Sequence, residues 1–363
     1  MEDRKIRVAI THGDTNGIGY EVILKALEDP TMLELCTPII YGSPKVASYH
    51  KKALELETQY CIINSAEEVR EDRVNLLATF DDEVKVELGQ PTDESAEAAR
   101  RAVARAKEDL IKGLYDVLVM GPVRSNPNPA KEDKSLTIMV SDAIRIALAT
   151  THLPIKDVAQ AITTEKIVNK IRIFHASLKR DFRISSPRVA VLALNPQLGS
   201  EEEEIIKPAI ATLAQEAMPV FGPYLADEFF GNHLYDHFDG VLAMYDDQGT
   251  LPFRSLALDG GVKLKAGISA ICTTPDQDPA FEIAGKNIAD PQSMRQAIYT
   301  AIDMFRFRGE YDEPLANQLP KLYHEKREDG DKARFAMKAK DQFKKADEQA
   351  KKPEDQAKKP EEK

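Results

Sequence analysis

The chain has 363 residues, of which 42% are hydrophobic and 30% charged, and its net charge at pH 7 is −11. Length and composition are those of a globular protein with more than one domain, and the acidic balance argues against a nucleic-acid-binding role for its body. No apolar run approaches the roughly 20 residues of a membrane span. The N-terminus enters a strand pattern without a signal-peptide core, so we expect a cytoplasmic protein.

Seven short apolar runs predict strands, because each is bounded by turn residues or leads into a helical pattern. In chain order they cover residues 6–11, 37–42, 115–121, 144–150, 187–194, 239–245 and 268–274. Helical patterns lie at 19–28, 44–55, 92–112, 164–179, 201–217 and 291–308. The helix at 92–112 opens with a Thr-x-x-Ser/Glu capping region and ends in glycine. Strands that alternate with helices, several of them apolar on both faces, predict an α/β fold with a largely parallel sheet.

From about Lys326 the chain has few large apolar residues, and "QAKKPED" at 349–355 recurs as "QAKKPEE" at 356–362. This segment carries 13 basic and 10 acidic residues, a net charge of +3. Pro353 and Pro360 favour an extended end. We expect a solvated, disordered tail over 326–363 in preference to a partner-binding element.

The three cysteines, Cys36, Cys61 and Cys272, are far apart and have no metal-type spacing. An odd number of isolated cysteines favours reduced, structural thiols.

The turns after the predicted strands are the candidate site, because ligands of open α/β sheets bind beyond the carboxyl ends of the strands. "THGDTNGIGYE" at 11–21 is Gly-rich but fits neither G-x-G-x-x-G nor a P-loop, so alone it is a weak nucleotide signal. "THLP" places His152 at a strand end. The next three strands are followed by "NPQLG", "DDQGTLPF" and "TPDQDPAFEIAGKN".

Together these turns resemble the 4-hydroxythreonine-4-phosphate dehydrogenase family of vitamin B6 biosynthesis, throughout residues 5–325. The matching pieces are "ITHGDTNGIGYEV", "TTHLP", "PRVAVLALNP", "FGPYLAD", "FDGVLAMYDDQGTLPF", "DGGV" and "AFEIAGKN". The resemblance implies two α/β domains with mostly parallel sheets and an interdomain cleft, as in isocitrate and isopropylmalate dehydrogenases. We expect the first domain over 1–120 plus about 285–325, and the second, with the dimer interface, over 121–284.

The resemblance also implies a reaction. The family oxidises a secondary alcohol with NAD, and the resulting β-keto acid loses carbon dioxide. A divalent metal held by three histidines polarises the oxygen, and basic groups bind the phosphorylated substrate. The expected cofactors are therefore NAD and Zn²⁺, Mg²⁺ or Mn²⁺, and the expected assembly is a homodimer whose site is completed across the interface.

The metal positions depart from the family pattern. His152 matches the first histidine, but Gln197 stands in the family's "NPHAG" and Asp246 in its "YHDQG". A carboxylate suits a hard ion such as Mg²⁺ or Mn²⁺, whereas a neutral amide is a poor exchange for imidazole. We expect at most a weak, oxygen-rich metal site, and we favour a structural role for His152.

Other family features are also changed. The "PGHTE" segment and the Gly-rich loop after "NPHAG" are missing, and "SPDHGT" has become "TPDQDPA". Some cationic character is retained, since Arg254 stands at a family lysine and Lys263 at a family asparagine. The candidate substrate- or anion-binding residues are Arg254, Lys263 and Asp247. An ordinary solvated charge is an equally favoured interpretation of both cations.

The losses cluster in the site while the core patterns are intact, which favours a folded protein whose ancestral activity is weak or lost. Two alternatives stay open. One is an active family dehydrogenase with altered metal or substrate. The other is a non-catalytic scaffold that binds a ligand or a partner.

Overall fold

The structure is a computed structural model and describes residues 4–80, 84–124, 135–258 and 260–316. Its strands are β1 (Ile6–Thr11), β2 (Cys36–Gly42), β3 (Tyr60–Ile63), β4 (Val74–Ala78), β5 (Val117–Met120), β6 (Leu136–Val140), β7 (Arg145–Leu148), β8 (Val189–Leu192), β9 (Val220–Tyr224), β10 (Gly240–Ala243), β11 (Val262–Ala266) and β12 (Cys272–Pro275). Its α-helices are α1 (Gly19–Ala26), α2 (Met32–Leu35), α3 (Pro44–Ala53), α4 (Asp93–Ile111), α5 (Ile155–Ala161), α6 (Thr164–Phe182), α7 (Lys207–Gln215), α8 (Ala226–Gly231), α9 (Asp246–Leu256) and α10 (Gln292–Ala316).

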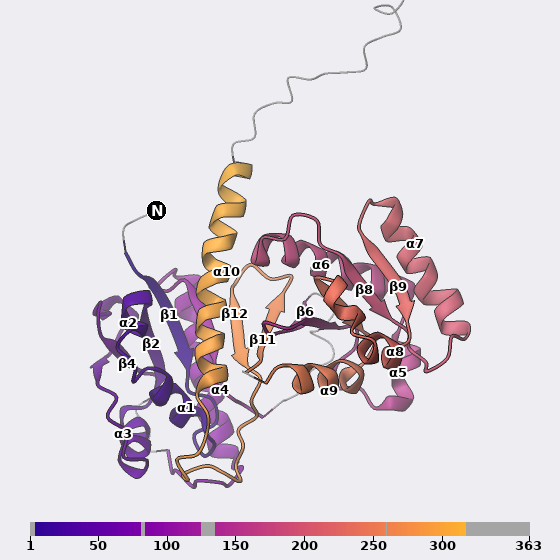
Figure 1. The fold of residues 1–363 in the computed structure, drawn as a ribbon. Coiled ribbons are helices and arrows are strands. Elements are labelled where there is room, and N and C mark those ends of the chain that lie inside the picture. Colours follow the sequence, from indigo (N-terminus) through magenta and orange to yellow (C-terminus); the bar gives the residue numbers. More distant parts are fainter. Residues whose placement is uncertain (1–3, 81–83, 125–134, 259, 317–363) are drawn as a thin grey trace, which may run out of the picture. The chain divides into compact units, whose positions relative to one another are not determined.

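These strands form one sheet in the order β3-β4-β2-β1-β5-β12-β11-β6-β7-β10-β8-β9 (Figure 1). Neighbouring strands run parallel except at the pairs β12–β11, β11–β6 and β6–β7. The α/β fold with a mostly parallel sheet is therefore confirmed. The sheet continues through both of the domains expected from the sequence, and the division at residue 120 stays a prediction. The expected tail at 326–363 lies outside the described residues.

Both faces of the sheet are buried, as the doubly apolar strands predict. On β1, Val8 and Ile10 join one apolar cluster, while Ala9 between them joins another. Successive side chains of a strand point to opposite faces, so the helices must cover both sides. Helix α4 packs on β1 and β2, α6 on β6 and β11, and α9 on β7 and β10.

Local sequence signals explain where the helices begin and end. The Thr92 side chain accepts a hydrogen bond from the Ser95 backbone N–H at 3.2 Å, which caps α4 as predicted. Gly113 follows that helix with φ +69°, a left-handed conformation that glycine adopts without strain. The predicted helix at 201–217 is two elements: a π-helical turn, η3 (Glu202–Ile206), precedes α7.

The seven predicted strands are all present with shifted ends, but the sequence reading missed five others. These are β3, β4, β6, β9 and β11. One expectation was wrong: the polar stretch after β10 is not a turn, because α9 begins at Asp246. Acidic side chains in a first helical turn interact favourably with the helix dipole, which explains why "DDQG" starts a helix.

Two further findings bear on the sequence analysis. The three cysteines are free thiols, and burial raises the pKa of Cys36 to about 12 and that of Cys272 to about 11. Among the described residues, no helix has the length and apolar character needed to cross a membrane.

Candidate functional site

The turns that follow β7 and β10 meet at one edge of the sheet, because these strands are parallel neighbours. Thr150 joins them: its backbone N–H and its hydroxyl both donate to the Met244 carbonyl, at 3.2 and 2.7 Å. The backbone N–H of His152 donates to Asp246 Oδ2 at 2.5 Å. The structure therefore brings together two of the three positions at which the resemblance implies metal ligands.

The carboxylate of Asp246 has a structural task in this arrangement. It holds the backbone of His152, which has a left-handed φ of 55° that is uncommon for a residue with a side chain. Asp246 is half-buried in the first turn of α9, while His152 and the neighbouring Asp247 are exposed. One oxygen of the Asp246 carboxylate is thus already engaged by an N–H group.

Gln248 supports the same edge, and sequence reasoning missed it. Its Oε1 accepts from the Met244 backbone N–H and its Nε2 donates to the Ala193 carbonyl, both at 2.7 Å. The side chain therefore links the ends of β10 and β8 and fixes the start of α9.

The third family position, Gln197, is exposed in the loop that follows β8. A fully buried carboxylate, Glu202, holds this loop. Its Oε1 accepts from the backbone N–H groups of Leu194 and Asn195, both at 2.9 Å, and its Oε2 accepts from Gly199 at 2.7 Å. Burial opposes ionisation of Glu202, but the hydrogen bonds from Asn195 and Gly199 outweigh it and lower the pKa of the carboxyl.

Sequence reasoning missed Glu202 because it lies in a run of four glutamates, "SEEEEII", which reads as a solvated face. The one signal was the position of the run, directly after a strand-end loop that contains Asn195 and Gly199.

A three-histidine metal site does not fit these residues. The expected homodimer would add ligands from a second subunit, so donor chemistry decides the fit rather than distances inside one chain. His152 offers the only imidazole of the three positions, Gln197 offers a neutral amide, and Asp246 accepts an N–H bond. Within the described ranges, no three His, Cys, Asp or Glu side chains are grouped so that they could hold a metal ion.

The two candidate cations, Arg254 and Lys263, converge on a carboxylate that the sequence analysis did not single out. Asp276 follows β12, and its side chain is only 4% exposed. Arg254 donates through Nε and Nη2 to its two oxygens, at 3.1 and 3.2 Å, and Lys263 Nζ lies 2.6 Å from Oδ1. Burial tends to raise the pKa of Asp276, but the bond from Arg254 and the charge of Lys263 together lower it.

This triad shows how the two cations are held. Both are paired with one buried carboxylate, and their side chains are 47% (Arg254) and 34% (Lys263) exposed. Arg254 also lies 3.9 Å from the exposed Asp278, so two carboxylates oppose the two cations beside the adjoining cleft.

That cleft has a volume of about 720 Å³ and is formed largely by the loop after β12. Its described lining carries four carboxylates and two guanidiniums: Asp276, Asp278, Glu282, Asp290, Arg124 and Arg254. An excess of carboxylates repels the pyrophosphate of a dinucleotide. The space is sufficient for part of NAD, but the charge of the lining does not fit its phosphates.

The Gly-rich turn at 11–21 is packed against its own chain. The N–H of Ile18 donates to the Pro279 carbonyl and that of Asp14 to the Pro122 carbonyl, both at 2.9 Å. A Cβ on Gly17 would lie 2.5 Å from the Pro279 oxygen, so glycine is required for this close approach. The turn therefore joins two segments of the chain, and these amides are not directed at a phosphate.

Comparison with known proteins identifies the chain's relatives. The profile of the family described as pyridoxal phosphate biosynthetic protein PdxA matches residues 34–132 and 127–301. A 4-hydroxythreonine-4-phosphate dehydrogenase of Bacteroides thetaiotaomicron is 47% identical over 92% of this chain and 98% of its own length. One from Sulfurihydrogenibium sp. is 33% identical, over 84% of this chain and 99% of its own length.

A solved structure agrees with these sequences. A 4-hydroxythreonine-4-phosphate dehydrogenase from Burkholderia phymatum is 28% identical and superimposes with a TM-score of 0.67, covering 83% of this chain and 99% of that one.

Proposed function

This chain belongs to the family of pyridoxal phosphate biosynthetic protein PdxA, and we propose that it is a ligand-binding member in which metal-dependent alcohol oxidation is weak or lost. The observation that carries the proposal is the donor set at the family metal positions. One imidazole, one amide and one carboxylate that already accepts an N–H bond replace three imidazoles.

The surrounding structure supports the same proposal. The loop that contains Gln197 is hydrogen-bonded to the buried Glu202. Asp246 is hydrogen-bonded to the His152 turn, and Gln248 is hydrogen-bonded to the end of β8. These side chains of the strand-end edge are therefore engaged in hydrogen bonds within the chain. The expected substrate cations, Arg254 and Lys263, are paired with Asp276, which reduces their attraction for a substrate phosphate.

One observation favours a second candidate function, an active NAD-dependent dehydrogenase with altered metal use. The backbone N–H of His152 donates to the Asp246 carboxylate, so the two residues lie side by side. A harder ion such as Mg²⁺ or Mn²⁺ accepts a carboxylate ligand. The 47% identical relative is named 4-hydroxythreonine-4-phosphate dehydrogenase. In this case a second subunit would complete the ligand set, and the homodimer expected from the resemblance stays part of the proposal.

The experiment is to measure NADH formation with 4-hydroxythreonine 4-phosphate, NAD and Zn²⁺, Mg²⁺ or Mn²⁺ in turn. The Bacteroides thetaiotaomicron relative is the positive control, and circular dichroism establishes that the chain is folded. We expect no turnover above background with any metal. Metal-dependent turnover within about tenfold of the control would overturn the proposal and establish the second candidate.

A further inference from the structure

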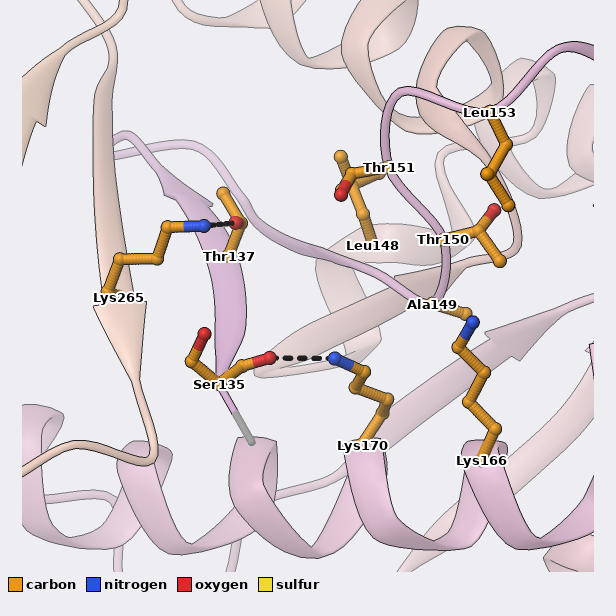
Figure 2. Close-up of a pocket in the computed structure, with 10 residues that line it drawn as sticks. All are labelled: Ser135, Thr137, Leu148, Ala149, Thr150, Thr151, Leu153, Lys166, Lys170 and Lys265. Atoms are coloured by element: carbon orange, nitrogen blue, oxygen red, sulfur yellow. Dashed lines mark hydrogen bonds between the residues drawn. The ribbon is translucent and has the colours of Figure 1, made fainter. Parts of the chain in front are cut away.

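We propose that a small cavity bounded by β7, the start of β6, β11 and α6 binds the phosphate group of a small molecule. Lys166, Lys170 and Lys265 line it together with the hydroxyl residues Ser135, Thr137 and Thr150 (Figure 2). The inference does not rest on the proposed function, because neither the metal positions nor the Asp276 triad takes part.

The charges of the cavity point to an anion. Lys166 and Lys170 are four residues apart on α6, so they lie on one face of the helix, one turn apart. Lys265 reaches the same cavity from β11 and donates to Thr137 Oγ1 at 2.6 Å. Among the described lining residues none is acidic, so the ammonium groups of Lys166 and Lys265 face one space and an anion would relieve their repulsion.

Hydrogen-bonding capacity agrees with a phosphate. Lys170 is 5% exposed and donates to the Ser135 carbonyl at 2.7 Å, which holds the start of β6 against α6. No described residue accepts a hydrogen bond from the Lys166 ammonium. The Thr137 hydroxyl accepts from Lys265 and therefore keeps its own proton to donate.

The size of the cavity selects the chemical class. Its volume is about 60 Å³, several times the roughly 10–15 Å³ that a cavity needs to hold one water molecule. A phosphate or phosphate monoester head fits this space, whereas a dinucleotide does not. The cavity lies beside the Thr150–His152 turn, at the carboxyl end of β7, where ligands of α/β sheets bind.

Isothermal titration calorimetry of the full chain in a phosphate-free buffer tests the proposal. Inorganic phosphate and O-phosphothreonine are the probes. Lys166→Met and Lys265→Met should each weaken binding about tenfold or more, because each removes a charge-assisted hydrogen bond. Lys156→Met, on an exposed lysine of α5 outside the cavity, is the matched control and should leave binding unchanged.

Tighter binding of the ester than of the free ion would assign the cavity to an organic phosphate, and equal binding would assign it to inorganic phosphate. Absence of binding at millimolar probe would overturn the proposal. It would also be overturned by binding that survives both cavity substitutions but is lost in Arg254→Met, because that result places the anion in the cleft. Unchanged circular dichroism of the variants separates these outcomes from misfolding.

Discussion

The Asp276 triad gives the sharpest prediction for stability. Asp276→Asn keeps the shape of the side chain but removes its charge and one acceptor oxygen. The remaining oxygen accepts from Arg254 or Lys263 but not fully from both, and the new amide N–H groups face the other cation. The variant therefore loses charge-assisted hydrogen bonds without opening a cavity.

The magnitude follows from the exposure of the three partners. Hydrogen bonds to charged groups contribute about 1.5–3 kcal/mol, and exposed ion pairs about 0–1 kcal/mol. Asp276 is 4% exposed, but Arg254 is 47% and Lys263 34% exposed, so solvent screens part of the interaction. We expect the free energy of unfolding to fall by about 2 kcal/mol, which lowers Tm by roughly 3 °C in a chain of this size.

The pH dependence has a definite sign. The folded pKa of Asp276 lies below its unfolded value of about 3.9, so the ionised carboxylate stabilises the fold above that pH. This stabilisation is lost as the pH falls through the folded pKa, and wild type and Asp276→Asn should converge in acid. Urea unfolding at pH 7 and at lower pH measures both quantities.

Asp278→Asn is the matched control, because Asp278 is 76% exposed and lies 3.9 Å from Arg254. It should change the free energy of unfolding by less than about 0.5 kcal/mol. An equal loss in the two variants, or a difference between wild type and Asp276→Asn that grows in acid, would refute the reasoning.

Three further predictions concern other buried contacts. Arg308→Met should lower the free energy of unfolding by about 3–5 kcal/mol in urea titrations, because Asp181 is 3% exposed and loses the guanidinium whose Nε lies 2.6 Å from it. Adding Asp181→Asn to this variant should recover part of the loss. If the effects of the two substitutions on the free energy of unfolding simply add, the pairing is contradicted. Glu202→Gln should lower the free energy of unfolding by about 2 kcal/mol, because an amide cannot accept all three backbone N–H bonds. Amide hydrogen exchange at Gly199 should become faster. Unchanged exchange there would show that Glu202 does not hold the loop. Asp246→Ala should speed amide hydrogen exchange at His152 about tenfold with little effect on global stability. The same exchange rate at His152 in the variant and the wild type would contradict the 2.5 Å bond.

Much of the fold could be predicted because the central strands are apolar on both faces. Residues such as Val8 and Ala9 must be buried on opposite sides of a sheet, so a run like "IRVAIT" has few other interpretations. The missed strand β11 is different: its alternating "VKLKA" buries only one face and carries two lysines. Such a strand depends on its neighbours β6 and β12 rather than on its own hydrophobicity.

The site was predicted less completely. Parallel neighbours place the ends of β7 and β10 together, so the proximity of His152 and Asp246 follows from the strand order. The sequence does not reveal that Asp276 lies between Arg254 and Lys263, since this depends on the antiparallel pairing of β11 with β12. The lysine cavity was missed for the same reason, because Lys166 and Lys265 are far apart in the chain and meet only in the folded protein.

The most direct test of the central claim is the Zn²⁺ affinity of the folded chain, measured by competition with a chelating indicator. The wild type is compared with Gln197→His/Asp246→His, which restores the imidazoles that the family carries. We predict weak binding by the wild type and an affinity higher by on the order of 100-fold in the double variant. Tight, stoichiometric Zn²⁺ binding by the wild type, unimproved in the double variant, would contradict the claim that these positions no longer form a metal site.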